Sequence, residues 1–267
     1  PTEPSAGQGA AREPTPTEEP APPPRTPPLQ LANAQPATLQ PGRPILAVVI
    51  DDVGVDVAHS RQAVRMPGPL TIAFLPYGYD LDAMVETARA QGHEIMVHLP
   101  MEPTNPDADP GPNALLTGLA TTEIDRRIAW NLGRIDRPVG LNNHMGSKFS
   151  SDRDAMRRVL DEVRRQGLFF LDSVTTAETQ GYRLAQEMGV PYAVRDVFID
   201  HSLDPETIRG QLAEALATAK RQGYAVAIGH PHDETLAELK RWLPTVEQAG
   251  VQLVPLSAVI RRRYGAG

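Results

Sequence analysis

Short apolar runs alternate with helix-forming segments from residue 45 to the C-terminal end of this chain. The runs are rich in Val, Ile, Leu and Ala, and they have the length of strands rather than of buried helices. They are ILAVVI at 45–50, LTIAFLP at 70–76, HEIMVHL at 93–99, VGLNN at 139–143, GLFFLD at 167–172, YAVRDVFID at 192–200, YAVAIGH at 224–230 and VQLVPL at 251–256.

The segments between these runs have the period of amphipathic helices, and several end at a glycine, as helices commonly do. They are 82–92, 121–135, 152–167, 206–223 and 234–250, with Gly92, Gly167, Gly223 and Gly250 at four of their ends. Apolar strands separated by helices are typical of a parallel sheet covered on its outer face. Seven or eight such units predict an α/β fold, a closed or nearly closed (β/α) barrel rather than an open doubly wound sheet.

Residues 1–44 have a different composition, rich in Pro, Ala, Thr, Gln and Glu and poor in large apolar residues. Such a segment cannot bury enough surface to offset the entropy of ordering it. We therefore predict a disordered, partly polyproline II linker at 1–44 and a barrel domain at 45–264. A tether favours a periplasmic or cell-envelope protein, and a segment upstream of Pro1 could have carried a signal peptide or an inner-membrane anchor.

The chain carries a net charge of -7 and no cysteine. The negative charge argues against nucleic acid as the main partner. Without thiolates, any metal must be held by His, Asp or Glu. No stretch is apolar for long enough to cross a membrane as a helix. The sequence leaves the oligomeric state open.

Polar residues gather where the predicted strands end, the position of catalytic groups in (β/α) barrels. They are Asp51, Asp52, His98, Glu102, Asn142, Asn143, His144, Asp172, Asp200, His201, His230 and His232. Each also has an ordinary structural explanation. Asp51 or Asp52 could cap a helix, His98 could be a satisfied buried histidine, and Asp172 could hold backbone amides. Their combination on one rim favours a metal site.

Several of these segments resemble a known family. VVIDDVG, GHEIMVHLPMEP and AIGHP are similar to the motifs of polysaccharide deacetylases. PGPNALLTGL, NNHMGSKF, GLFFLDS, RDVFID and WLP resemble the divergent group of that family found among bacterial envelope proteins. The resemblance runs from about Ile45 to Val259 and implies a distorted (β/α) barrel.

The resemblance also implies roles for individual residues. Asp51 corresponds to the general base, Asp52 and His98 to metal ligands, and His230 to the last catalytic histidine. The family's second histidine falls on Glu102, and its arginine motif has no counterpart here. We therefore expect His144 to complete the ligand set Asp52, His98 and His144, with Glu102 as the alternative third ligand.

Three ligands and a vacant position are the usual form of a catalytic zinc site, and zinc is the expected divalent metal. Asp51 would take the proton of water attacking an acetyl group, and His230 would protonate the leaving group. Asn143, Asp172 and Asp200 are expected to support the site, with Asp172 or Asp200 orienting a catalytic histidine.

We therefore predict a metal-dependent deacetylase acting on an envelope or extracellular polysaccharide. The alternative is a catalytically degenerate barrel that binds glycans or serves in envelope assembly. The lost second histidine favours the alternative, and the intact Asp pair with His230 favours the enzyme. Tyr77 and Tyr79 are candidates for stacking on sugar rings, although the segment PYGYD could equally be a simple turn.

Overall fold

The computed structural model describes residue 31 and residues 33–264. Its sheet has nine strands, and all of their pairings are parallel. The order across the sheet is β6-β5-β4-β3-β2-β1-β8-β7, with β9 paired to β1. The strands are β1 (Ile45–Val53), β2 (Thr71–Phe74), β3 (Glu94–Met101), β4 (Gly140–Met145), β5 (Phe169–Asp172), β6 (Tyr192–Val194), β7 (Val197–Phe198), β8 (Tyr224–Gly229) and β9 (Gln252–Leu253).

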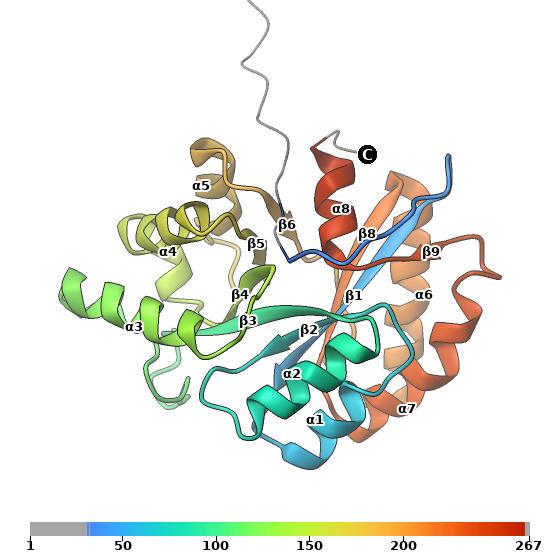
Figure 1. The fold of residues 1–267 in the computed structure, drawn as a ribbon, viewed down its shortest axis with the longest axis horizontal. Coiled ribbons are helices and arrows are strands. Elements are labelled where there is room, and N and C mark those ends of the chain that lie inside the picture. Colours follow the sequence, from blue (N-terminus) through green and yellow to red (C-terminus); the bar gives the residue numbers. More distant parts are fainter. Residues whose placement is uncertain (1–30, 32, 265–267) are drawn as a thin grey trace, which may run out of the picture.

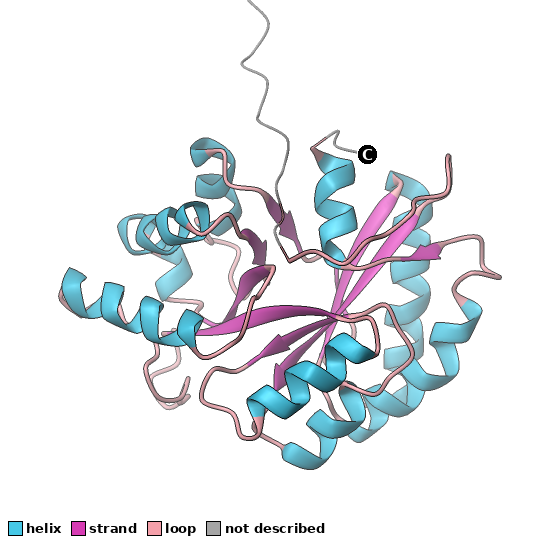
Figure 2. Cartoon of the chain, in the orientation of Figure 1, coloured by secondary structure: helices cyan, strands magenta, loops and turns pink. Residues whose placement is uncertain are grey.

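Helices follow most of the strands and surround the sheet (Figure 1, Figure 2). They are α1 (Val57–Ala63), α2 (Leu81–Ala90), α3 (Thr121–Gly133), α4 (Arg153–Arg165), α5 (Gly181–Met188), α6 (Pro205–Gln222), α7 (Asp233–Trp242) and α8 (Leu256–Arg263). The short 3-10 helices Phe149–Ser151 and Leu243–Thr245 complete the described elements. The alternation predicted from the sequence is confirmed.

The sheet curls into a barrel that is not fully closed. Its two edge strands, β6 and β7, are separated in the chain by Arg195 and Asp196 alone. The two edges must therefore come near one another, yet no ladder joins β6 to β7 within the described residues. This opening between the edges, which we call the seam, is the distortion of the barrel.

Strand alternation divides the core into two layers. On β1, Leu46, Val48 and Ile50 pack with the outer helices, whereas Ile45, Ala47 and Val49 belong to an inner cluster with Val259 and Ile260 of α8. The backbone amides of Leu256 and Ser257 bond to Thr71 Oγ1 and Glu94 Oε2, at the starts of β2 and β3. Helix α8 therefore fills the amino-terminal end of the barrel and leaves the carboxyl ends of the strands for the site.

Residues 33–44 lie in the predicted disordered linker, but the structure packs them against the domain. Leu39 contacts the inner apolar cluster, and the Gln35 amide donates to Glu94 Oε1 at 2.9 Å. Gln252 accepts from the Gln40 amide and donates to the Thr38 carbonyl. Few but well-placed apolar and amide groups thus hold this stretch, which we call the strap. The rest of the predicted linker, residues 1–30 and 32, lies outside the described residues.

Among the residues that the structure describes, no helix is long and apolar enough to cross a membrane.

Candidate metal centre

The Asp pair lies at an irregularity near the end of β1. Ile50 pairs with Ile72, and Val53 pairs with Phe74, so three steps on β1 oppose two on β2. Asp52 has a positive φ of 57°, which Asp tolerates better than most residues. Neighbours on a regular strand project to opposite faces, and a bulge redirects a side chain. Here the bulge turns both carboxylates toward the barrel interior.

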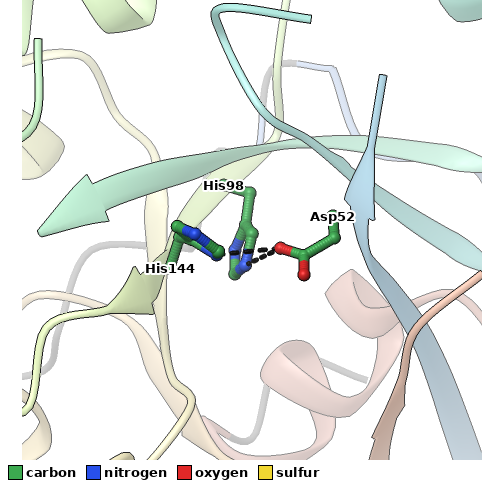
Figure 3. Close-up of side chains that lie close together, drawn as sticks. All are labelled: Asp52, His98 and His144. Carbon is green, nitrogen blue, oxygen red and sulfur yellow. Dashed lines mark ion pairs between the residues drawn. The ribbon is translucent and has the colours of Figure 1, made fainter. Parts of the chain in front are cut away.

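Asp52 points at two histidines from neighbouring strands (Figure 3). Its Oδ1 lies 3.2 Å from Nε2 of His98, on β3, and 2.8 Å from Nδ1 of His144, on β4. The two imidazole rings meet edge to face, with 4.9 Å between their centroids. The structure therefore brings together the three residues predicted as ligands.

The donor set fits a divalent cation. Asp52 Oδ1 is buried and has no hydrogen-bond partner among the described residues, although both imidazoles lie close to it. One atom from each of the three side chains lies within 4.8 Å of the others. Two imidazole nitrogens and one carboxylate oxygen match the ligands of a catalytic zinc site. An unsatisfied buried oxygen is costly, and a cation between the three groups would remove that cost.

The charge state of Asp52 agrees with this arrangement. Burial raises the pKa of its carboxyl, but His144 and His98 outweigh that effect and hold the pKa well below its usual range. Burial lowers the pKa of His98, and Asp51 and Asp52 more than offset it, so the net direction is upward. The two carboxylates thus create a place that favours positive charge.

Asp51 lies beside this group but is bound differently. It is 2% exposed, and Nδ2 of Asn142 is 2.9 Å from each of its oxygens. Its Oδ2 is 3.7 Å from Nε2 of His98. Burial raises the pKa of Asp51 above that of an ordinary carboxyl, against the opposing effects of His98 and His230. A buried carboxylate of raised pKa beside the three ligands has the placement of a general base.

His230 approaches from the other side of Asp52. Its Nε2 is 4.0 Å from Asp52 Oδ2, and its Nδ1 is 3.0 Å from Oδ1 of Asp200. Asp200 also accepts from the His230 backbone amide and the Thr235 hydroxyl. Burial lowers the pKa of His230, but the bond and charge of Asp200 together with the charges of Asp51 and Asp52 outweigh burial and raise the pKa to about 9. Asp200 therefore orients this histidine, with Nε2 facing the site.

Glu102, the alternative ligand, lies outside the group. Its carboxylate accepts from the amide and hydroxyl of Thr117 and from Lys148 Nζ at 2.7 Å. Burial raises the pKa of Glu102, but Lys148 and Thr117 lower it below the usual value. Glu102 thus fixes the loop after β3, and it does not belong to the group of ligands that contains His98.

The expected supporting residues have separate tasks. Asp172 accepts from the backbone amides of Val174 and Tyr182 and from the Thr179 hydroxyl, and within the described residues it forms no hydrogen bond to a histidine. Asn143 accepts from the Ser173 amide and donates to the Met145 carbonyl. Both hold the loops around the site rather than its reacting groups.

The two tyrosines also differ from one another. Tyr77 lines a cavity of about 490 Å³ together with Asp52 and His144. Burial raises the pKa of Tyr77 to about 12, so its hydroxyl keeps its proton. Tyr79 is 65% exposed and is not among the residues that line this cavity. The geometry therefore leaves Tyr77 as the better candidate for contact with a bound molecule.

Asn142 lies at the end of its predicted strand, but no role for it was predicted. Its Oδ1 is 2.9 Å from Nδ1 of His98, and its Nδ2 donates to Asp51 and to Ser173 Oγ. Asn142 lies opposite His98 in the β3–β4 ladder. Pairing the two predicted strands in this register would have placed Asn142 beside a predicted ligand. Asn142 thus links the predicted base to a predicted ligand.

A second group of possible ligands adjoins the first. Atoms of Asp200, His230 and His232 lie within 4.8 Å of one another. Both oxygens of Asp200 already accept hydrogen bonds, and the His232 side chain is exposed. This group is therefore better described as the hydrogen-bonded support of His230.

Comparison with known proteins agrees with the fold and with the family resemblance of the sequence. A sequence model of the divergent polysaccharide deacetylase family matches residues 48–260. The chain is 39% identical to the protein YibQ of Escherichia coli strain K12 over 196 residues, which are 73% of this chain and 61% of that protein. The chain thus spans about three fifths of the length of this relative.

Two solved structures are similar. The protein ATU2773 of Agrobacterium tumefaciens C58 is 27% identical, with a TM-score of 0.82 over 85% of this chain and 93% of that one. The peptidoglycan deacetylase PdaC of Bacillus subtilis shares the fold, with 16% identity and a TM-score of 0.50 over 85% of this chain and 96% of that one. The match to the family sequence model covers most of the chain, and this protein belongs to the divergent polysaccharide deacetylase family.

Proposed function

We propose that this protein is a metal-dependent hydrolase that removes acetyl groups from an envelope or extracellular polysaccharide. The observation that carries the proposal is that the adjacent residues Asp51 and Asp52 have different surroundings. Asp52 leaves a buried oxygen unsatisfied between two imidazoles, whereas Asp51 is held beside them by Asn142. One carboxylate is placed to bind a cation and the other to handle a proton.

Asp52, His98 and His144 would hold the cation, most simply Zn²⁺. A divalent metal supplies Lewis acidity, which polarises an acyl carbonyl and makes water easier to deprotonate. Asp51 accepts the proton of the attacking water at a carboxylate oxygen. Nε2 of His230 faces the same space and returns a proton to the leaving amine or alkoxide, while Asp200 stabilises the imidazolium through Nδ1.

A glycan-binding or envelope-assembly role without turnover is the second candidate. It is favoured by Glu102, which stands at the position of the second histidine of the motif and is engaged with Lys148 and Thr117. For either role we propose a periplasmic or envelope location, with the residues upstream of the strap acting as a tether to the inner membrane.

The test combines metal content with acetate release from a panel of acetylated glycans. Asp51→Asn keeps bound zinc but loses at least 100-fold in acetate release, because the base is gone while the three ligands remain. Asp52→Asn loses zinc and turnover together. Glu102→Gln is the control and retains both. Full turnover by Asp51→Asn would overturn the proposed base, and zinc binding without turnover on any glycan would favour the second candidate.

A further inference from the structure

The seam of the barrel places an arginine beside the proposed reaction site. We infer that Arg195 binds a carboxylate of the substrate, so that the preferred substrate is an acetylated glycan containing acidic sugars. This inference rests on the proposed function for the identity of the site. It adds the substrate class, which neither the ligand group nor the proposed base specifies.

Arg195 lies between the edge strands β6 and β7. Its backbone amide donates to the Asp172 carbonyl, which continues the β5–β6 ladder, and the next amide, of Asp196, donates to the Val226 carbonyl of β8. The Arg195–Asp196 link between the edge strands is therefore held by β5 on one side of the seam and by β8 on the other. Its side chain lines a cavity of about 320 Å³ at the seam, a volume within the range of small-ligand pockets.

This cavity also contains the proposed reacting groups. Asp51, His98 and His230 form part of its wall, and Ser173, Val174, Thr175 and Phe198 form another part. A sugar that enters the cavity would meet both Arg195 and the groups proposed to hydrolyse the acetyl group. The guanidinium therefore lies where it can bind a substituent of the reacting sugar or of the adjacent sugar in the glycan.

The guanidinium is held in place but not saturated. Nε donates to the Ser173 carbonyl at 2.7 Å, and Nη2 donates to the Val174 carbonyl at 3.1 Å. The centroid of the Phe198 ring lies 5.2 Å from the central carbon of the guanidinium. Arginine has five N–H donors, so three have no acceptor within the described chain. Two backbone carbonyls and a ring thus fix the fork and leave donors for a ligand.

No carboxylate of the described residues lies within ion-pair distance of Arg195. The nearby acids have other partners: Asp51 is bound by Asn142, Asp172 by backbone amides, and Asp196 by Gln222 and the Val226 amide. A divalent cation would offset the charges of Asp51 and Asp52. The guanidinium then has carboxylates in its neighbourhood, but none of those in the described residues is paired with it directly.

A carboxylate is the ligand that best matches this fork. Its two oxygens can accept parallel bonds from a guanidinium, and such bonds are stronger and more directional than those to a neutral hydroxyl. Burial also lowers the pKa of Arg195, a cost that a bound anion would remove. A neutral glycan would leave the charge unpaired in the cavity.

The test measures binding separately from turnover. Zinc-loaded Asp51→Asn is titrated calorimetrically with chitotetraose, which is neutral, and with a hyaluronan tetrasaccharide, in which N-acetylglucosamine alternates with a carboxylated sugar. We expect the acidic oligosaccharide to bind about 10-fold more tightly than the neutral one. Adding Arg195→Gln, which keeps an amide donor for the backbone carbonyls, should remove this preference and leave chitotetraose binding unchanged.

Two further variants complete the design. Arg195→Lys keeps the charge without the fork and should retain part of the preference. Arg158→Gln removes an arginine that pairs with Asp125 on the outer helices and should retain all of it. A preference that survives Arg195→Gln, or equal weakening of both oligosaccharides by that change, overturns the inference. Absence of acetate release would count against the proposed function but would leave the binding preference measurable.

Discussion

Nδ1 of His98 lies 2.9 Å from the side-chain oxygen of Asn142. The Asn142 nitrogen donates to Asp51 and Ser173, so its oxygen faces the imidazole and must accept a hydrogen bond from Nδ1. The proton on Nδ1 leaves the lone pair on Nε2, the atom that faces Asp52. Asn142 thereby sets the tautomer in which His98 can bind a cation.

Replacing Asn142 with Leu should weaken zinc binding by about 10-fold to 100-fold, the usual effect of losing a group that orients a metal-binding histidine. The variant keeps all three proposed ligands, so the loss would come from orientation alone. Isothermal titration with ZnCl₂ measures it, with Glu102→Gln as a control of unchanged affinity. An unaltered dissociation constant in Asn142→Leu would contradict this role.

His93 gives the fold a dependence on pH that is separate from the site. Its side chain is fully buried, its Nδ1 accepts from the Leu70 amide, and burial lowers its pKa to about 4. An unfolded histidine has a pKa of about 6.5, so the unfolded chain binds more protons between these values. The contribution of neutral His93 to the free energy of unfolding is therefore fully present above pH 6.5, and it declines as the pH falls toward 4.

The difference between the pKa values of His93 in the unfolded and folded states sets the size of this loss. Between pH 7.5 and pH 4.5 the free energy of unfolding should fall by an amount on the order of 2–3 kcal/mol. His93→Asn retains an acceptor near the Nδ1 position but cannot be protonated. Urea unfolding at both pH values should show the stability of the wild type approaching, at pH 4.5, that of the variant. A gap between the two proteins that does not change with pH would refute the assignment.

The strap should contribute to stability although its composition resembles a linker. A chain that begins at residue 45 loses the contact of Leu39 with the inner cluster and the bonds of Gln35 to Glu94 and of Thr38 to Gln252. We expect a loss on the order of 2 kcal/mol, which lowers the melting temperature by about 4–8 °C relative to a chain that begins at residue 31.

Chain length is controlled by a third protein in which the strap, residues 33–44, is replaced by an equally long Gly-Ser segment. It should melt close to the chain that begins at residue 45. Calorimetry distinguishes the three proteins, and equal melting temperatures would show that the strap contributes nothing.

Alternation along the strands separates the reacting residues from their structural neighbours. His98 follows Met96 of the inner cluster by two positions, and His230 follows Ile228 in the same way. Asp172 instead follows Phe170, which packs with the outer helices, and its bonds accordingly go to the loop before α5 and to the first turn of that helix. The alternation of side chains along β5 places Asp172 on the outer face. That alternation could therefore have excluded Asp172 as a partner of a catalytic histidine.

Other features could not be obtained from local patterns. Glu102 aligns with a histidine motif, but its partners Thr117 and Lys148 come from segments whose placement depends on the whole loop. The strap lacks the apolar period that identifies a helix or strand, and its bonds reach residues as distant as Gln252. Hydrogen bonds between distant parts of the chain leave no periodic signal in the sequence.

The order of apolar runs and amphipathic segments was enough to determine the barrel, because periodic burial requires strands to pair in parallel under covering helices. The motifs at the strand ends were enough to indicate the family and the candidate ligands. Only the tertiary structure decided that Asp51 and Asp52 face the same side, since that depends on how β1 and β2 fall out of register. It also decided which neighbours each carboxylate has, and those neighbours separate the proposed ligand from the proposed base.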